Sequence, residues 1–391
     1  MIRLAIRMLT GDRAKFIGIL VGISFASLLI TQQSAIFVGL MTRTYSFVTD
    51  TPVADLWVMD PEVEHHADAK PMLPTQLHRV RGVEGVDWAV PMFKTFARLR
   101  LPNGALRNCI LIGIDDVTLI GGPPGMVEGT IGDLWKTDAV IVDAAEVDRK
   151  LSIFDRDPRT RKPVGPTRPT RIGDVLELND HRAEVVGTFS ASPSFFWEPT
   201  IYTTYSRAMR FRPTERRQMH FVLVKARPGE NLDALAERIR ERTGMSAHTR
   251  AGFQWLTARY ILEKTGIAIN FGIAVLLGFI VGAAIAGQTF HSFTLENMRY
   301  FGTLKAMGAG DGTLLRMIVA QALCAGFLGF GLGLGAAAVF GEVVKRSDLA
   351  FVMDWRLVAV TAAAVLMISV GAAAVSLRRV IRLEPGIVFK V

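Results

Sequence analysis

Four long hydrophobic runs interrupt a chain that is otherwise rich in charged residues. They are Phe16–Leu40, Ile267–Gly287, Ile318–Phe340 and Leu357–Leu377, and each holds 20 or more residues without a formal charge. A helix of about 20 apolar residues crosses a hydrocarbon core roughly 30 Å thick, and backbone groups in lipid must bond within their own segment. The pattern therefore predicts four transmembrane helices, over residues 16–40, 265–288, 315–340 and 357–377.

The first run is also compatible with a cleaved signal peptide. Its 25 uncharged residues exceed the roughly 7–15 of a signal peptide's apolar region, and no clear cleavage site of small residues follows it. We therefore expect a retained membrane anchor.

Residues 41–264 alternate short strand and helix patterns. Met219–Lys225 is typical of a strand, and Asn231 is a good N-cap for a helix over Leu232–Thr243, which Gly244 would end. Further strands are predicted at 53–59, 86–90, 95–101, 139–142, 175–178 and 183–189, and a short helix at 74–80. The predicted fold class is an α+β membrane protein. Its four transmembrane helices carry a large extracytoplasmic α/β domain (41–264), with an inserted mostly-β lobe (about 108–217), between the first and second helices.

The charge distribution predicts the orientation. The chain has a formal net charge of +9, yet residues 41–264 hold 31 Lys or Arg against 29 Asp or Glu. The N-terminus, the loop between the second and third runs and the C-terminus together hold 11 basic and 4 acidic residues. This asymmetry follows the positive-inside rule and does not indicate a nucleic-acid partner. We expect an inner-membrane protein with a cytoplasmic interfacial segment at 1–15, a cytoplasmic loop at 289–314, a periplasmic loop at 341–356 and a cytoplasmic tail at 378–391, and with residues 41–264 in the periplasm.

Few polar side chains fall within the four runs, and Gln321 is the main exception. Channels and secondary transporters use charges or broken helices inside the membrane, so a substrate path through the bilayer is not expected. Small-residue pairs permit close helix contacts, either within the chain or with a second copy, and we expect at least two of the three to pack within it. These pairs are Gly18/Gly22, Gly278/Gly282 and Gly331/Gly335.

The sequence contains no candidate catalytic site. It lacks the G-x-x-x-x-G-K-[ST] phosphate-binding loop, and it lacks G-x-S-x-G and H-E-x-x-H motifs. The cluster Glu62, Glu64, His65, His66 and Asp68 is reminiscent of metal ligands, but adjacent residues of a strand point to opposite faces, so a solvated loop is favoured. We expect no cofactor and no metal, with any ATP bound by a partner subunit.

The sequence does not decide the function of two other features, the cysteines and an aromatic stretch. Cys109 and Cys324 fall in different predicted compartments, so no disulfide is expected between them. The aromatic residues 195–197 are either an apolar patch for a partner or a plug beneath the inserted lobe.

Residues 296–310, Glu-Asn-Met-Arg-Tyr-Phe-Gly-Thr-Leu-Lys-Ala-Met-Gly-Ala-Gly, carry a family resemblance. They resemble the cytoplasmic loop of FtsX-like ABC-transporter permeases, and the basic tail ending in Glu384-Pro385 is similar to that family's tail. With the stretches 55–60 and 183–187, the whole chain is identified as a member of the macrolide-exporter (MacB-type) branch, closest to DevC-type permeases. The family often has Glu where Tyr300 stands and Asp where Glu384 stands.

The resemblance implies a permease subunit of an ATP-driven, mechanotransmission-type exporter. Its implied partners are a separate ABC ATPase, a second permease copy, a periplasmic adaptor and an outer-membrane channel. The alternatives are lipoprotein release and FtsX-like activation of an external hydrolase.

The residues expected to form or support the ATPase contact lie in the loop 289–314. Arg299, Gly302 and Lys305 recur at helical spacing and would share one face, and a glycine there lets a partner backbone approach. The alternative is that Arg299 and Lys305 bind lipid headgroups. The full set of candidate residues is Glu296, Arg299, Gly302, Lys305 and Gly308.

Overall fold

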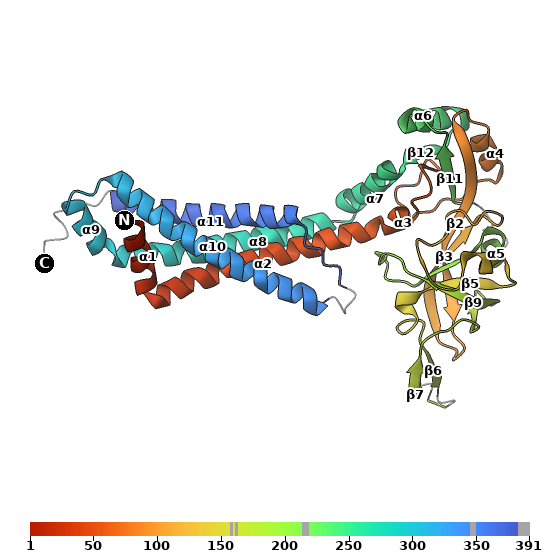
Figure 1. Cartoon of the computed structure of the whole chain (residues 1–391), viewed down its shortest axis with the longest axis horizontal. Coiled ribbons are helices and arrows are strands. Elements are labelled where there is room, and N and C mark those ends of the chain that lie inside the picture. The colour runs from red at the N-terminus through yellow and green to blue at the C-terminus, as the bar shows by residue number, and fades with distance from the viewer. Residues whose placement is uncertain (157–158, 161–162, 213–218, 345–348, 382–391) are drawn as a thin grey trace. The chain divides into compact units, whose positions relative to one another are not determined.

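A computed structural model describes the chain except for residues 157–158, 161–162, 213–218, 345–348 and 382–391 (Figure 1). The chain divides into two compact units. The helical unit comprises Met1–Met41 and Thr265–Val391, and the sheet unit comprises Thr42–Lys264.

The helical unit contains four long helices and two short ones. The long helices are α2 (Arg13–Thr44), α8 (Ile267–Glu296), α10 (Asp311–Val344) and α11 (Trp355–Ile381); the short ones are α1 (Ile2–Gly11) and α9 (Met298–Ala306). Within the described residues, the four long helices are the ones long and apolar enough to cross a membrane. The prediction of four membrane helices is confirmed.

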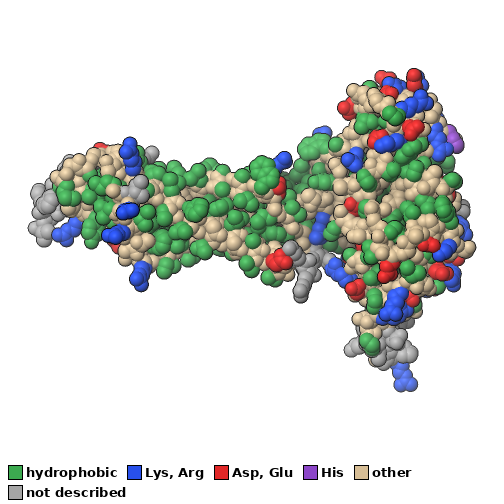
Figure 2. All heavy atoms as spheres, in the orientation of Figure 1, with side chains coloured by type: hydrophobic (Ala, Val, Ile, Leu, Met, Phe, Trp, Pro, Cys, Tyr) green, Lys and Arg blue, Asp and Glu red, His purple; other side chains and the backbone are tan. Residues whose placement is uncertain are grey.

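The surface of the long helices is strongly apolar. Figure 2 shows hydrophobic side chains along their visible length, and Ile269 and Phe327 are 66% and 78% exposed. Exposing such a surface to water is unfavourable, whereas contact with lipid tails is not. The exposed apolar belt is therefore the lipid-facing side of a membrane protein.

Glycines let the long helices approach closely. A Cβ added at Gly22 would lie 2.6 Å from Cγ2 of Ile285, and one at Gly282 would overlap Ala26. Gly278 faces Leu29, whereas Gly331 and Gly335 have no atom of the described chain near their Cβ positions. The expectation that at least two of the three glycine pairs pack within the chain is confirmed.

The sheet unit is built on a mixed ten-stranded sheet. Its strands run in the order β12-β1-β11-β2-β3-β10-β5-β9-β4, and β8 pairs with β2 and β9. The strands are β1 (Leu56–Met59), β2 (Val86–Arg100), β3 (Leu106–Ile114), β4 (Met126–Glu128), β5 (Ala139–Asp143), β8 (Val175–Leu178), β9 (His181–Phe189), β10 (Thr200–Thr204), β11 (Phe221–Ala226) and β12 (Ser246–Thr249). A separate pair is formed by β6 (Ile153–Arg156) and β7 (Pro163–Arg168).

Helices cover parts of this sheet. They are α3 (Ser46–Thr49), α4 (Thr75–Arg81), α5 (Tyr205–Arg210), α6 (Leu232–Thr243) and α7 (Arg250–Lys264), with 3-10 turns η1 (Ile131–Trp135) and η2 (Ala144–Glu146). The predicted cap of α6 is confirmed, because Asn231 Oδ1 accepts hydrogen bonds from the backbone N–H groups of Asp233 and Ala234. Gly244 ends the helix in the left-handed conformation at φ 72°.

The prediction of two strands at 86–90 and 95–101 is wrong, because both belong to the 15-residue strand β2. Its first half pairs with β11 and its second half with β3. Met92 packs into one core cluster and Phe93 into another, so both faces of the strand are buried where the two halves meet. That double burial removes the alternation by which a strand is recognised. The base and the predicted inserted lobe therefore share one sheet.

Candidate functional site

A turn built on Gly308 separates α9 from α10 at one end of the helical unit. Gly308 has φ 93°, a left-handed conformation that costs glycine little and lets it end a helix. The backbone N–H of Ala309 donates to the carbonyl of Leu304 at 3.0 Å. Lys305 then forms an ion pair with Asp311, at 3.1 Å, in the first turn of α10. The loop between the second and third long helices is thus a short, fixed helix.

One face of α9 packs into the core of the helical unit and the opposite face is exposed. Phe301 and Leu304 are buried in the same cluster as Leu314 of α10. Tyr300 and Met307 are 64% and 71% exposed. The helix is therefore anchored by its apolar side and presents large side chains outward.

The N-terminal helix α1 lies at the same end of the helical unit. Its residues Ala5 and Leu9 are fully buried, and the side-chain amide of Gln321 on α10 donates to the Ala5 carbonyl at 2.8 Å. Lys15, at the start of α2, forms ion pairs with Asp12 and with Glu296 at the end of α8. Donation from the backbone N–H of Lys15 helps keep the pKa of Asp12 below its usual value.

A cavity of about 780 Å³ lies between α1 and the junction of α8 and α9. Figure 2 shows Lys and Arg side chains gathered on this end of the helical unit. A hollow with both apolar and charged walls suits a protein partner better than lipid tails, which reward only apolar contact. Its lining comprises Leu4, Arg7, Met8, Gly11, Asp12, Arg13, Glu296, Asn297 and Tyr300.

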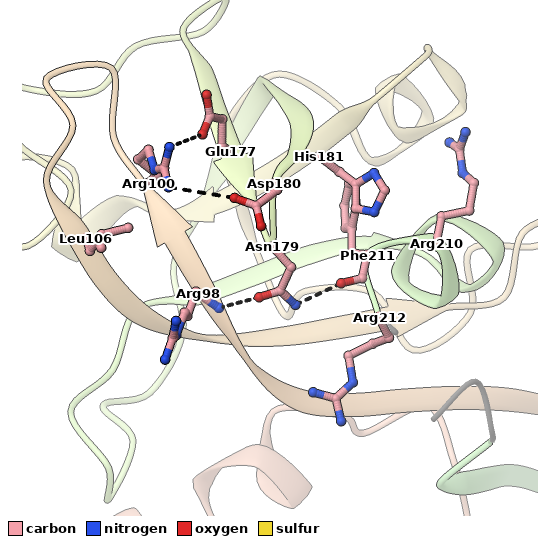
Figure 3. Close-up of a pocket in the computed structure, with 10 residues that line it drawn as sticks. All are labelled: Arg98, Arg100, Leu106, Glu177, Asn179, Asp180, His181, Arg210, Phe211 and Arg212. Carbon is pink, nitrogen blue, oxygen red and sulfur yellow. Dashed lines mark hydrogen bonds and ion pairs between the residues drawn. The ribbon is translucent and has the colours of Figure 1, made fainter. Parts of the chain in front are cut away.

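The sheet unit has a separate groove of about 670 Å³, shown in Figure 3. Arg100 on β2 pairs with Glu177 and Asp180, at 3.4 and 3.7 Å. Asn179 accepts a hydrogen bond from the backbone N–H of Arg98 and donates one to the carbonyl of Phe211. The groove is therefore framed by the β2–β3 and β8–β9 hairpins and the end of α5.

Comparison with known families decides the class of protein. The model of the MacB-like periplasmic core domain matches residues 16–242, more than half of the chain, and that of the FtsX-like permease C-terminal matches residues 272–385. The chain belongs to the MacB-like and FtsX-like family of ABC-transporter permeases. This confirms the resemblance carried by residues 296–310, which fall within the second match.

Curated relatives of this MacB- and FtsX-type permease are distant. An uncharacterized ABC transporter permease of Methanocaldococcus jannaschii is 25% identical over 183 residues, covering 46% of this chain and 45% of that protein. The macrolide export ATP-binding/permease protein MacB of Burkholderia pseudomallei is 25% identical over 225 residues, covering 53% of this chain and 33% of that protein. The chain therefore spans less than half the length of these relatives.

Two solved structures are similar to part of this permease. The extracellular domain of the noncanonic ABC-type transporter YknZ from Gram-positive bacteria is 14% identical, with a TM-score of 0.33, covering 50% of this chain and 98% of that chain. The periplasmic region of MacB from Actinobacillus actinomycetemcomitans is 12% identical, with a TM-score of 0.36, covering 51% of this chain and 90% of that chain.

The structure brings the five candidate residues of the permease to one end of the helical unit but gives them different environments. Glu296 and Arg299 are exposed, and Glu296 lines the cavity beside α1. Gly302 is buried, so it does not share the exposure of Arg299. Lys305 is half-buried in its ion pair, and Gly308 shapes the turn. Sequence reasoning placed residues 1–15 at the cytoplasmic surface but missed α1 as a wall of this site.

Two other groups of residues that the sequence singled out, the cluster at 62–68 and the aromatic residues 195–197, lie in the sheet unit. Within the described residues, no group of three or more His, Cys, Asp or Glu side chains is arranged to hold a metal ion. The expectation of a solvated loop is wrong at His66, which is 3% exposed. Of the aromatic residues 195–197, Phe196 packs against a core cluster while Trp197 is exposed.

Proposed function

We propose that the chain is the permease subunit of an ATP-driven exporter that works by mechanotransmission. In this proposal a separate ABC ATPase, which binds the ATP, docks against α9 and α1 on the cytoplasmic side. The observation that carries the proposal is the exposed set Arg299, Tyr300 and Met307 beside a cavity of about 780 Å³. Arg299 would provide the charged contact and the two large side chains the buried contact with the ATPase.

The contacts of α9 support a mechanical role. Phe301 and Leu304 fix α9 to the core, and the ion pairs Lys305–Asp311 and Lys15–Glu296 connect its flanks to α10 and α2. The helices α8 and α10 hold 30 and 34 residues, which corresponds to about 45 and 51 Å at ~1.5 Å per residue. A displacement of α9 would therefore pass into elements long enough to cross the bilayer.

The substrate would be handled by the sheet unit on the periplasmic side. Residues 16–42, 267–290, 317–341 and 357–377 contain no Asp, Glu, Lys or Arg, and the side-chain nitrogen of Gln321 donates to the Ala5 carbonyl. These helices offer little with which to bind a polar substrate. In this account the sheet units of two copies work with a periplasmic adaptor and an outer-membrane channel, and both termini are cytoplasmic.

The test is charge reversal at Arg299. Tagged wild-type chain and the variant Arg299→Glu would be purified from native membranes, and co-purifying proteins would be identified by mass spectrometry. We expect an ATP-hydrolysing partner with the wild type and an at least tenfold loss with the variant, because a like or unpaired charge at an interface costs about 2–5 kcal/mol. Equal recovery of the ATPase with both chains would remove the assignment.

A matched control is Arg356→Glu. Arg356 is also exposed, but it is the second residue of α11 and does not belong to α9. Both variants should insert into the membrane normally, and only Arg299→Glu should lose the ATPase. The other proteins recovered separate the alternatives: an adaptor and channel support export, a lipoprotein carrier supports lipoprotein release, and a hydrolase supports regulation.

A further inference from the structure

The loop of residues 193–199, here called the aromatic loop, carries three consecutive aromatic side chains on the sheet unit. Phe196 packs against a core cluster and so holds the loop to the sheet. The rings of Phe195 and Trp197 stack with their centroids 6.1 Å apart, and Trp197 is 42% exposed. Phe96 on β2 is 45% exposed and meets Phe196 edge-on at 5.5 Å. These rings form one continuous apolar surface, which is typical of a binding surface.

Polar contacts fix the conformation of the aromatic loop. Asp50 accepts hydrogen bonds from the backbone N–H and the hydroxyl of Ser192, just before the loop, at 2.8 Å each. The ammonium of Lys150 donates to the carbonyl of Trp197. Trp197 has φ 53°, a left-handed conformation that bulky residues rarely adopt. Such a conformation persists only where surrounding contacts impose it, and it is concentrated at functional segments.

The residue that holds the aromatic loop lies just beyond the end of the membrane helix α2. Residues 16–42 carry no formal charge, and α2 ends at Thr44. The short helix α3 follows, and Asp50 comes directly after it. A residue spans at most ~3.6 Å of extended chain and ~1.5 Å of helix, so Asp50 lies within about 16 Å of Thr44.

A second set of contacts connects the aromatic loop to α3. The ring of Phe47 on α3 lies 5.7 Å from that of His66, which in turn lies 6.3 Å from the ring of Phe196, between centroids. A small cavity of about 30 Å³ is lined by α3 residues and by Ser194 of the loop. The aromatic loop therefore lies beside the segment in which the chain leaves the membrane.

The composition of the aromatic loop suits the interface between lipid and water. Tryptophan is enriched there because its ring is apolar while its N–H can still bond to water or headgroups. Lys150 places an ammonium beside the loop, and charged amines bind lipid phosphates. The one acidic residue of the loop, Glu198, is half-buried.

We propose that the aromatic loop inserts Phe195 and Trp197 into the phospholipid headgroup layer on the sheet unit's side of the membrane. A bilayer is about 40–45 Å thick around a hydrocarbon core of about 30 Å, so this layer is roughly 5–8 Å deep. One or two side chains at the tip of a loop can fill that depth. The sheet unit thereby contacts the membrane at a third place, besides its two connections to α2 and α8. This contact does not depend on the ATPase contact proposed above.

Quenching of tryptophan fluorescence in lipid nanodiscs tests the proposal on the full chain. The probe is phosphatidylcholine brominated in the upper part of its acyl chains, because bromine quenches an indole that it touches. The chain has six tryptophans, so the Trp197 signal is the difference between the wild type and Trp197→Phe in each lipid. We expect the brominated lipid to remove about half of this signal, since an interfacial indole lies next to the brominated carbons.

Two further variants calibrate the measurement. Trp57→Phe reports a fully buried tryptophan of the sheet unit, whose signal should not change in brominated lipid. Trp355→Phe reports the first residue of the membrane helix α11, which is 72% exposed and whose signal should be quenched. Each replacement keeps an aromatic ring, and thermal unfolding checks that each variant folds.

The depth of the bromine decides between insertion at the headgroups and other arrangements. Lipid brominated near the ends of its acyl chains should quench the Trp197 signal much less than lipid brominated in the upper part. A Trp197 signal that neither lipid changes would overturn the proposal and would leave the aromatic loop facing water or a protein partner. Equal quenching by both lipids would also contradict a position in the headgroup layer. No ATPase is needed, so the result is independent of the proposed function.

Discussion

A single half-buried carboxyl group, that of Asp143, sets part of the pH response of the sheet unit. Asp143 ends β5, and its Oδ1 accepts a hydrogen bond from the backbone N–H of Ala145, at 3.0 Å. Burial nevertheless raises the pKa of Asp143 from 3.8 to about 6. Between these two values the folded state binds more protons than the unfolded state, so stability falls as pH rises through this window and the full penalty applies above pH 6.

Replacing Asp143 by Asn should therefore stabilise the protein near neutral pH. The amide oxygen can still accept from Ala145, and the half-buried charge is removed. We expect an increase of roughly 2–5 °C in the unfolding temperature at about pH 7.5 and almost none near pH 4. Thermal unfolding of both chains at the two pH values is the measurement, and an equal shift at both would show that the carboxylate charge is not the cause.

At the same scale, the sequence misplaced His66 for a physical reason. Its neighbours Glu62, Glu64 and Asp68 are typical of a solvated loop, and a local pattern predicts only local structure. His66 is buried because Lys94, 28 residues further along the chain, contacts its ring and carbonyl. No spacing rule connects a histidine in a loop to a lysine in a strand, so this contact was not predictable from the sequence.

At the scale of whole elements, the sequence predicted an element correctly where residues within that element set its ends. The helix α6 was predicted with its N-cap and its final glycine because Asn231 and Gly244 act within one turn of the helix. The strand β2 was divided in two because its centre is buried on both faces by different core clusters. The short helix α9 was expected from its charged residues, whereas the burial of Gly302 depends on packing that only the folded helical unit provides.

The contact between α2 and α8 gives an element-scale prediction. Gly282→Val should push the two helices apart, because even a Cβ at this position overlaps Ala26. Overpacking of this kind typically costs about 1–3 kcal/mol. Unfolding temperature in detergent is the measurement, with Gly287→Val as the control. Gly287 is on the same helix and has no atom within 4 Å of its Cβ position. Equal losses in both variants would argue against close α2–α8 packing.

At the scale of the whole molecule, four membrane helices with a large domain inserted between the first and the second could be predicted from composition and length alone. The candidate site could be predicted from the sequence only in part. Glu296 and Lys15 lie in different parts of the sequence and meet only when α2 and α8 fold together. The hydrogen bond from Gln321 to Ala5 likewise joins α10 to α1. Contacts such as these, between residues far apart in the sequence, assemble the cavity beside α9. The periodicity of hydrophobic residues along the sequence does not predict them.

ATP turnover in lipid nanodiscs tests the central claim most directly. The chain alone should hydrolyse no ATP, and adding the ATPase recovered with it should produce turnover that Arg299→Glu lowers at least tenfold, a difference of about 1.4 kcal/mol or more. Arg356→Glu should support turnover like the wild type. ATP hydrolysis by the purified chain alone, or full turnover with Arg299→Glu, would contradict the account of a permease driven by a separate ATPase through α9.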